Sequence, residues 1–269
     1  MVRQGVAKLL LVVEGEDDQF ILREHVTEDL LLVLGVGGKE SLLEAARLSE
    51  ERGVTGVRYL VDADYDALVH PGSSYAATVI SSTHHDLMMD VVNASPVLLE
   101  RTIQTHSRKA ARRGIEVDAE SWRREALVLA ARIAPLRMVN HRHDLGLNLR
   151  NFPIGTLSSV NPIDAELAKI TIGRSETALL ANDLIGLMAA ETAIADSHPP
   201  EVLAGDHDLF RALARVMKSK GVTAGAEEML NSCIAALTCE YLCMIEVFRK
   251  VAAWCSENSK AAFTCVPVG

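Results

Sequence analysis

The segment LLLVVEGEDDQF, residues 9–20, decides how this chain folds. It starts with an unbroken aliphatic run, which Glu14 and Gly15 end abruptly. A short aliphatic, β-branched run closed by glycine is typical of a buried strand in a parallel sheet. Helical spacing follows from Asp17 to Val26, so the segment predicts a strand and then a helix. Glu14 therefore stands at the carboxyl end of a core strand, where ligands bind in open α/β sheets.

A second aliphatic run ends in carboxylates about fifty residues later. The sequence VRYLVDADYD, residues 57–66, places Asp62, Asp64 and Asp66 after the predicted strand. If the two strands are parallel neighbours, Glu14, Asp62 and Asp64 converge at one edge of the sheet. Carboxylates that lie so close repel one another unless a hard divalent cation lies among them, and Mg²⁺ or Mn²⁺ suits such oxygen ligands. The two strand ends therefore predict a metal site.

The remaining pattern predicts an α/β fold followed by a helical region. Further strands are expected at 30–36 and 78–82, with helices between the strands, which gives a mainly parallel four-stranded sheet with helices on both faces. From Pro96 onward the pattern is mostly helical, with a loop at 140–144 (NHRHD) and a return to the sheet at 201–205. The expected helices of this region are 98–113, 119–135, 175–195, 206–220 and 226–256. We expect a core over 1–95, a helical basic insertion over 96–195, and a C-terminal helical region over 196–269 that returns to the core.

Composition and charge limit the classes of function. Apolar residues make up 49% of the 269 residues and aromatic residues 4%, so the core must be aliphatic. The net charge is −9, but residues 101–150 carry 11 Lys or Arg against 5 Asp or Glu, a net of +6. A basic segment beside an acidic site suits a metal-dependent nuclease, because one part binds the cation and the other the phosphate backbone. A solvated helix face explains the same charges equally well.

The cysteines and the apolar runs bear on location. No apolar run approaches the roughly 20 residues that cross a bilayer, and the N-terminus is interpreted as a first strand rather than a signal peptide. All five cysteines lie within residues 233–265, and a C-x₃-C spacing without a second pair or a nearby histidine is poor for zinc. Free thiols in a reducing cytoplasm are therefore expected.

Five short motifs occur in an order that resembles a known family. They are VEGEDDQF, VGGKESL, YLVDADYD, STHHDL and AGDHDLFRAL, and they span the chain from residue 13 to residue 213. Together they resemble the Toprim-like nucleases of the OLD type that are paired with ABC-type ATPases in anti-phage defence. The resemblance implies a toxic effector that hydrolyses RNA such as tRNA, or DNA, with Mg²⁺ or Mn²⁺, and that an ATPase partner controls. Dimers are common among such nucleases, and the sequence leaves a homodimer open.

The resemblance implies roles for particular residues. Glu14, Asp62 and Asp64 would hold the metal, Asp18 would be an outer ligand or proton acceptor, and Asp66 would serve a second metal or support the first. These residues give a catalytic set of Glu14, Asp18, Asp62 and Asp64. The candidate substrate contacts are Lys39, Arg108, Lys109, Arg112 and Arg113, and the accessory candidates are Asp86, His207, Asp208 and Lys218.

Simpler interpretations stay open for several of these residues. Lys39 follows a Gly-Gly turn before a helix, and a plain strand-to-helix turn explains it without a phosphate. His84 and His85 suit a capping role as well as a metal. Asp206 and Lys218 suit an N-cap and a charge at a helix C-terminus.

The chain also departs from the family pattern. Met88 stands where the relatives carry a glutamate, so Asp86 or Asp90 must substitute for it or one metal position is weakened. The main alternative is therefore a non-catalytic Toprim-like subunit that binds or regulates within an ATPase complex. A phosphatase or phosphotransferase that uses the same acidic edge is a further alternative, against which the basic segment speaks.

Overall fold

The computed structural model describes residues 8–157 and 163–265, which form two compact units. The first unit comprises the described parts of 1–63, 73–95 and 237–269, and the second comprises 64–72 and the described parts of 96–236. The chain therefore passes from the first unit to the second directly after Ala63. This grouping differs from the three consecutive segments expected, because residues 237–265 join the first unit and residues 196–236 stay with the second.

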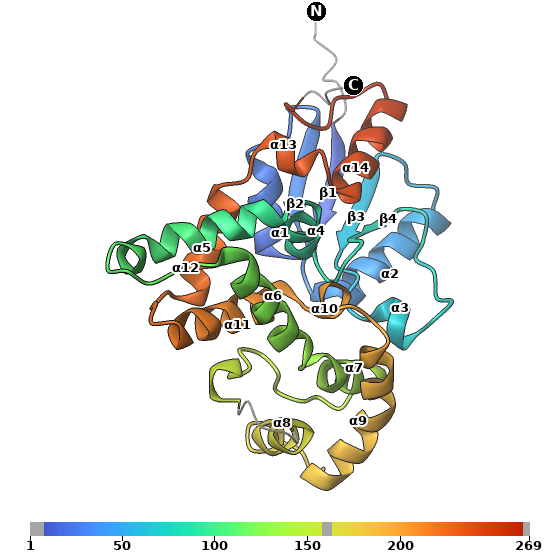
Figure 1. Ribbon diagram of the computed structural model, residues 1–269. Helices are drawn as coiled ribbons and strands as arrows, with labels where there is room; N and C mark the ends of the chain where they lie inside the picture. Colours follow the sequence, from blue (N-terminus) through green and yellow to red (C-terminus); the bar gives the residue numbers. More distant parts are fainter. Residues whose placement is uncertain (1–7, 158–162, 266–269) are drawn as a thin grey trace, which may run out of the picture. The chain divides into compact units, whose positions relative to one another are not determined.

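The first unit is built on a four-stranded parallel sheet, which confirms the predicted α/β fold. Its strands are β1 (Leu9–Val13), β2 (Leu30–Leu34), β3 (Val57–Val61) and β4 (Val79–Ser81), in the order β2-β1-β3-β4 (Figure 1). All three neighbouring pairs run parallel. The helices of this unit are α1 (Glu16–Arg23), α2 (Gly38–Glu51), α4 (Leu87–Ala94), α13 (Cys239–Leu242) and α14 (Glu246–Glu257).

Strand β1 is central in the sheet and has apolar contacts on both of its faces. Leu9, Leu11 and Val13 are buried on one face. Leu10 and Val12, on the other, pack against a cluster that α2 and β3 supply. This burial explains why the strand reads as a continuous aliphatic run rather than as an alternating pattern.

The direction of the chain connections reverses between β1 and β3. From β1 the chain moves outward to β2, and it then crosses back to β3 on the other side of β1. Right-handed connections place the two crossover helices, α1 and α2, on opposite faces of such a sheet. The carboxyl ends of β1 and β3 therefore form the topological switch point, where doubly wound sheets bind their ligands.

The second unit is helical. Its elements are α3 (Asp66–Val69), α5 (Pro96–Ala111), α6 (Ala119–Ala131), α7 (Ala134–His143), the 3₁₀ turn η1 (Ile154–Thr156), α8 (Ile163–Ile172), α9 (Ala181–Asp196), α10 (Pro200–Leu203), α11 (Asp206–Ser219) and α12 (Ala226–Ala235). Helix α11 packs against α6 and α12, and α7 packs against α9. Across the described residues of both units, no helix is long and apolar enough to span a bilayer.

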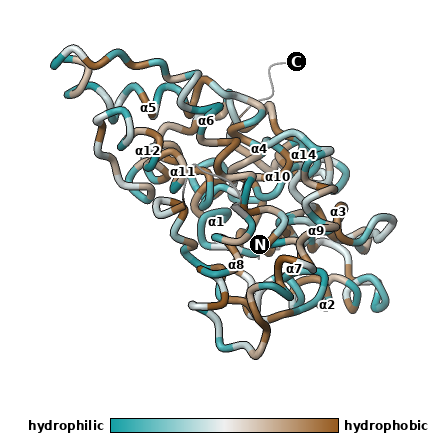
Figure 2. The backbone as a smooth tube through the Cα atoms, turned by 60° about the horizontal axis from the view of Figure 1, so that its bottom comes forward, coloured by the Kyte–Doolittle hydropathy of each residue, from teal (hydrophilic) through white to brown (hydrophobic). Residues whose placement is uncertain are grey.

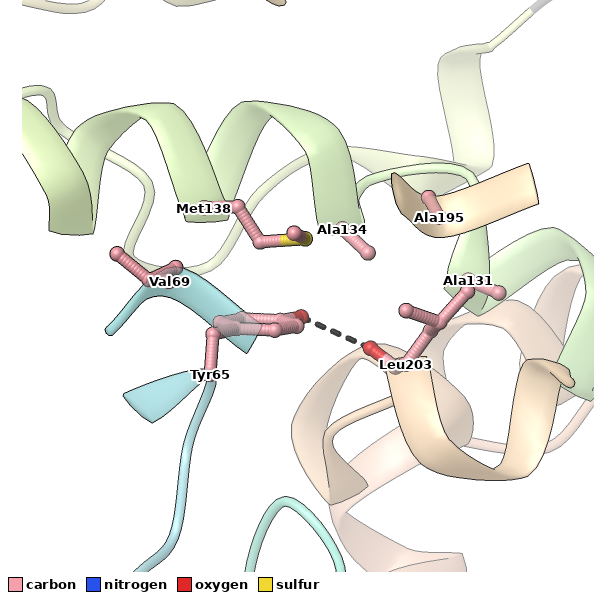
Figure 3. Packing of buried hydrophobic residues seen from close by; sticks show 7 residues of the cluster. All are labelled: Tyr65, Val69, Ala131, Ala134, Met138, Ala195 and Leu203. Atoms are coloured by element: carbon pink, nitrogen blue, oxygen red, sulfur yellow. Dashed lines mark hydrogen bonds between the residues drawn. The ribbon is translucent and has the colours of Figure 1, made fainter. Parts of the chain in front are cut away.

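The short segment 64–72 is built into this helical unit. Tyr65 and Val69 are buried in one cluster with Met138, Ala195 and other side chains (Figure 3). The Tyr65 hydroxyl donates a hydrogen bond of 2.8 Å to the backbone oxygen of Leu203. The residues that follow the acidic end of β3 thus have a packed position of their own.

Three expectations for the helical region are wrong. Residues 201–205 do not return to the sheet but belong largely to α10, because Pro200 fits the first turn of a helix, where no backbone N–H is needed. The expected loop at 140–144 is largely the last turn of α7, where its basic side chains suit a helix C-terminus. The single helix expected at 226–256 is three helices, because Thr238 and Ile245 adopt extended backbone conformations before α13 and α14.

The expectation of free thiols is wrong for two cysteines. Cys239 and Cys265 form a disulfide, while Cys233, Cys243 and Cys255 are free. The pairing arises because the chain after α14 returns to the end of α1, where Val26 and Phe263 form an antiparallel bridge. Nothing in the spacing of the cysteines reveals this return.

Candidate functional site

Glu14 and the backbone of Asp62 meet at the switch point of the sheet. The Glu14 N–H donates to the Leu60 oxygen at 3.1 Å, which extends the pairing of β1 and β3 by one residue. Oε2 of Glu14 accepts the backbone N–H of Asp62 at 3.2 Å. Glu14 and Asp62 are both half-buried. The expected neighbourhood of these two strand ends is therefore present in the structure.

Asp18 is held against the same strand end by the start of α1. Its Oδ2 accepts the N–H of Gly15 at 3.0 Å, which satisfies a donor that precedes the helix. A Cβ atom at position 15 would lie only 3.2 Å from that oxygen, so glycine leaves the room that this carboxylate needs. The sequence EGEDD thus bends the chain and aims Asp18 back toward the end of β1.

The charge of Asp18 is disfavoured in this position. Burial is the main cause that raises the pKa of Asp18 to about 7; the hydrogen bond from Gly15 opposes the rise, and the nearby carboxylates of Asp86, Glu14 and Asp17 contribute to it. An acid in such surroundings stays protonated well above its ordinary range. Acidic groups from α1, from the end of β1 and from the start of α4 therefore act on one another in the first unit.

Asp86 and Asp90 differ in their surroundings. Asp86 caps α4 by accepting the N–H of Met89 at 2.7 Å, and its other oxygen lies 3.2 Å from Nδ1 of His85. Asp90 is buried and accepts the backbone N–H groups of Thr83 at 2.9 Å and His84 at 2.7 Å. These bonds assign Asp90 to shaping the loop after β4, whereas Asp86 acts electrostatically on Asp18.

The two histidines of this loop pair with carboxylates. Nδ1 of His84 lies 2.8 Å from Oδ1 of Asp90, in the same loop that Asp90 orders.

Met88, which stands where the resembled family pattern has a glutamate, is buried with 2% of its surface exposed. Its side chain therefore packs in the interior and cannot supply a ligand at the acidic edge.

The carboxylates of the first unit approach one another without forming a closed ligand set. Among its described residues, no three carboxylates bring oxygens within 4.8 Å of one another. The oxygen donors and the raised pKa of Asp18 fit a hard divalent cation, which would lower that pKa and draw the oxygens closer.

Asp64 and Asp66 belong to the second unit. Asp64 has a left-handed backbone with φ of 47°, and Asp66 begins α3. The Oδ1 atom of Asp66 lies 2.6 Å from Nε2 of His141 on α7. The structure therefore gives Asp66 a partner within the helical unit, and the ligand roles of both residues stay predictions.

The predicted substrate cations fall into two groups. Lys39 is half-buried in the first turn of α2, and its ammonium lies 5.9 Å from the centre of the Tyr75 ring. The other four predicted cations lie in the last turn of α5 and just after it, are exposed, and have no recorded ion pair with any described residue: Arg108, Lys109, Arg112 and Arg113. Figure 2 shows hydrophilic residues around the tip that joins α5 to α6.

Other arginines of the basic segment have partners. Arg123 pairs with Glu100 at 3.0 Å, and Arg142 pairs with the buried Glu191 at 2.5 Å. Arg137 donates two hydrogen bonds to Asp208, at 2.6 and 2.9 Å. The net charge of residues 101–150 therefore overstates the cations available to a ligand, and the end of α5 keeps the largest unpaired share.

The accessory candidates near residue 207 lie on α11. Asp208 is buried, and its two carboxylate oxygens accept the paired hydrogen bonds from Arg137. His207 and Lys218 are exposed at the two ends of the helix. The geometry favours a structural role for Asp208, because a buried carboxylate needs such a partner.

One cavity lined by arginines was not predicted from the sequence. Arg124, Arg132 and Arg215 line a cavity of about 460 Å³ in the second unit. The spacing of Arg124 and Arg132 on one side of α6 was visible in the sequence. The contribution of Arg215 was not, because it depends on the packing of α11 against α6.

Comparison of this chain with family models and with curated proteins gives no match. Its site must therefore be judged by its own residues.

Replacement of Asp18 by asparagine should change how stability depends on pH. The folded chain holds a proton on Asp18 up to about pH 7, whereas the unfolded chain releases it near pH 4. The free energy of unfolding of the wild type should therefore fall, relative to Asp18→Asn, by up to roughly 4 kcal/mol between these two pH values. Urea unfolding across this range measures the difference, and a difference that does not change with pH would contradict the environment described for Asp18.

Proposed function

We propose that this chain is a metal-dependent nuclease of the Toprim type that hydrolyses phosphodiester bonds in RNA, such as tRNA, or in DNA. The observation that carries the proposal is the acidic edge of the sheet. There Glu14 accepts the N–H of Asp62 at the switch point, and the buried carboxyl of Asp18 has a pKa of about 7. The order of the five sequence motifs supports the same class.

Each residue of the acidic edge has a chemical role in this proposal. Glu14 and Asp62 would hold Mg²⁺ or Mn²⁺. Asp64, two residues after Asp62, stays the third predicted ligand. The bound cation supplies charge neutralisation at the phosphate and acidifies water. Asp18 would accept a proton at its carboxylate, which a bound cation would keep in its ionised form. Asp86 adds negative charge two residues before Met88, which stands where the resembled family pattern has a glutamate.

The unpaired cations at the end of α5 would hold the phosphate backbone. Their side chains are exposed and have no recorded ion pair among the described residues, so binding a polyanion breaks no ion pair known in the structure. Release of counterions from the nucleic acid then drives the association. Control by an ABC-type ATPase and a role as a toxic effector in anti-phage defence belong to the same proposal and rest on the motif resemblance.

A second candidate is a non-catalytic subunit that binds nucleic acid or an ATPase. The buried Met88 favours it, because its side chain supplies no metal ligand at the position where the resembled family has a glutamate. The two candidates differ in whether bound metal leads to cleavage.

The variant Glu14→Gln tests the catalytic proposal. Wild-type protein is incubated with total tRNA and with plasmid DNA, with Mg²⁺, Mn²⁺ or a chelator, in the presence and absence of the ATPase partner. We expect metal-dependent cleavage by the wild type and a loss of at least about 100-fold in Glu14→Gln, because a ligand of the cation is removed.

The matched control is Glu24→Gln, the same change at an exposed position after α1. It should cleave like the wild type. Equal activity of Glu14→Gln and the wild type would contradict the proposed site. Metal binding by a wild type that cleaves neither polymer would support the binding subunit instead.

A double charge reversal tests the proposed nucleic-acid surface. The double variant Arg108→Glu with Lys109→Glu should bind the nucleic acid that the wild type cleaves about tenfold or more weakly. The salt dependence of its binding affinity should also be smaller, because phosphate contacts are lost. The matched control is Arg249→Glu with Lys250→Glu, another exposed Arg-Lys pair on a helix. Filter binding at several salt concentrations gives both quantities, and equal weakening by the two double variants would contradict a specific surface at α5.

A further inference from the structure

Three potential metal ligands lie together in the first unit, far from one another in the sequence. Nδ1 of His25 lies 3.7 Å from Sγ of Cys239 and 3.7 Å from Sγ of Cys265. The three atoms all lie within 4.8 Å of one another. His25 follows α1, Cys239 begins α13, and Cys265 follows α14, so three separate parts of the chain supply the cluster (Figure 1).

The segment that carries Cys265 is held to the rest of the unit by contacts other than the disulfide. The Thr264 N–H donates to the His25 oxygen at 2.7 Å, and the Thr27 N–H donates to the Ala262 oxygen at 2.9 Å. Phe263 stacks on Phe248 of α14, with ring centroids 3.5 Å apart. These contacts keep the ligands near one another when the disulfide is opened.

The spacing of the cluster suits a tetrahedral zinc site. Zinc binds thiolate sulfur at about 2.3 Å and imidazole nitrogen at about 2.0 Å, which places sulfur and nitrogen about 3.6 Å apart around a tetrahedron. The two observed sulfur–nitrogen distances, 3.7 Å each, agree with this value. Once the sulfur–sulfur bond is broken, the two sulfurs need to separate to about 3.8 Å, which side-chain rotation about the Cα–Cβ bonds can provide.

Cys239 and Cys265 also line a cavity of about 950 Å³. The cavity gives a reductant and a cation access to the two sulfurs. Among the free cysteines, Cys233 and Cys255 are poor competitors, because burial raises the pKa of their thiols to about 12 and about 11. Cys243 lines the same cavity but is not part of the cluster.

We propose that His25, Cys239 and Cys265 form a zinc site that is available only when the Cys239–Cys265 disulfide is reduced. A dithiol reductant transfers two electrons and two protons to the disulfide, which becomes two thiols, while the reductant becomes a disulfide. Binding of Zn²⁺ then releases those two protons and leaves a neutral set of one dication and two thiolates beside the imidazole. Water from the cavity completes the four ligands. The site is independent of the proposed nuclease activity.

Cobalt binding to the full chain tests this proposal. Metal-free protein is divided into a reduced sample and an oxidised sample, and each is titrated with Co²⁺ and then with Zn²⁺ under argon. The reduced protein should bind one equivalent of Co²⁺, with thiolate-to-cobalt charge-transfer absorption and the visible bands of a tetrahedral site, and Zn²⁺ should displace it. The oxidised protein should show neither absorption.

Two variants and a control identify the ligands. His25→Gln retains both thiols and the backbone contacts of residue 25, and it should lower the affinity for zinc by at least about tenfold through loss of one ligand. Cys265→Ser should abolish the charge-transfer band of a two-thiolate site, and circular dichroism shows whether each variant is folded. The matched control Cys243→Ser should bind like the wild type. Equal binding by oxidised protein, no binding by reduced protein, or loss of binding in Cys243→Ser would overturn the proposal.

Discussion

The burial of Asp18 beside other carboxylates at the end of β1 is the constraint on which the rest of this structure depends. Burial disfavours the charge of Asp18 most, and the carboxylates of Asp86 at the start of α4 and Glu14 at the end of β1 disfavour it further. Folding brings these groups together although their mutual interaction opposes it. A proton on Asp18 relieves the repulsion at low pH, and a divalent cation would relieve it at neutral pH. In the proposed function, the same arrangement would bind the metal and supply the base.

The sheet overcomes this cost by aliphatic packing. β1 is buried between β2 and β3, with leucine and valine side chains in contact on both faces. The parallel register pairs Val13 with Leu60. The backbone N–H of the next residue, Glu14, still donates to the Leu60 oxygen. Because this pairing extends one residue beyond β1, Glu14 and Asp62 lie directly after the ends of paired strands. The chain leaves this edge at Ala63 and enters the helical unit with Asp64.

Local patterns predicted the sheet well because the physical signal was local. The aliphatic runs located all four strands to within about two residues, whereas the full strand order required the structure. The neighbourhood of Glu14 and Asp62 was predicted by the same logic. The hydrogen bond from Gly15 to Asp18 required the structure, and the role of Asp18 in the site stays a prediction.

Features that depend on distant contacts could not be predicted. The Cys239–Cys265 disulfide and its neighbour His25 need the return of the chain after α14, of which the sequence carries no sign. The net charge of the basic segment could not show which arginines pair, since Arg137 finds Asp208 71 residues away. The sequence predicts a return to the sheet at 201–205 where the structure has α10. A proline signals the boundary of an element but does not tell which type of element follows.

The most direct measurement of the central claim is a count of bound Mn²⁺ by electron paramagnetic resonance, in which only the free ion gives the sharp six-line signal. At neutral pH the wild type should remove at least one Mn²⁺ per chain from solution. Folded Glu14→Gln should leave the same Mn²⁺ free, because the carboxylate at the switch point is lost. Undiminished binding by Glu14→Gln, or no binding by the wild type, would contradict the claim that the strand-end carboxylates form a cation site.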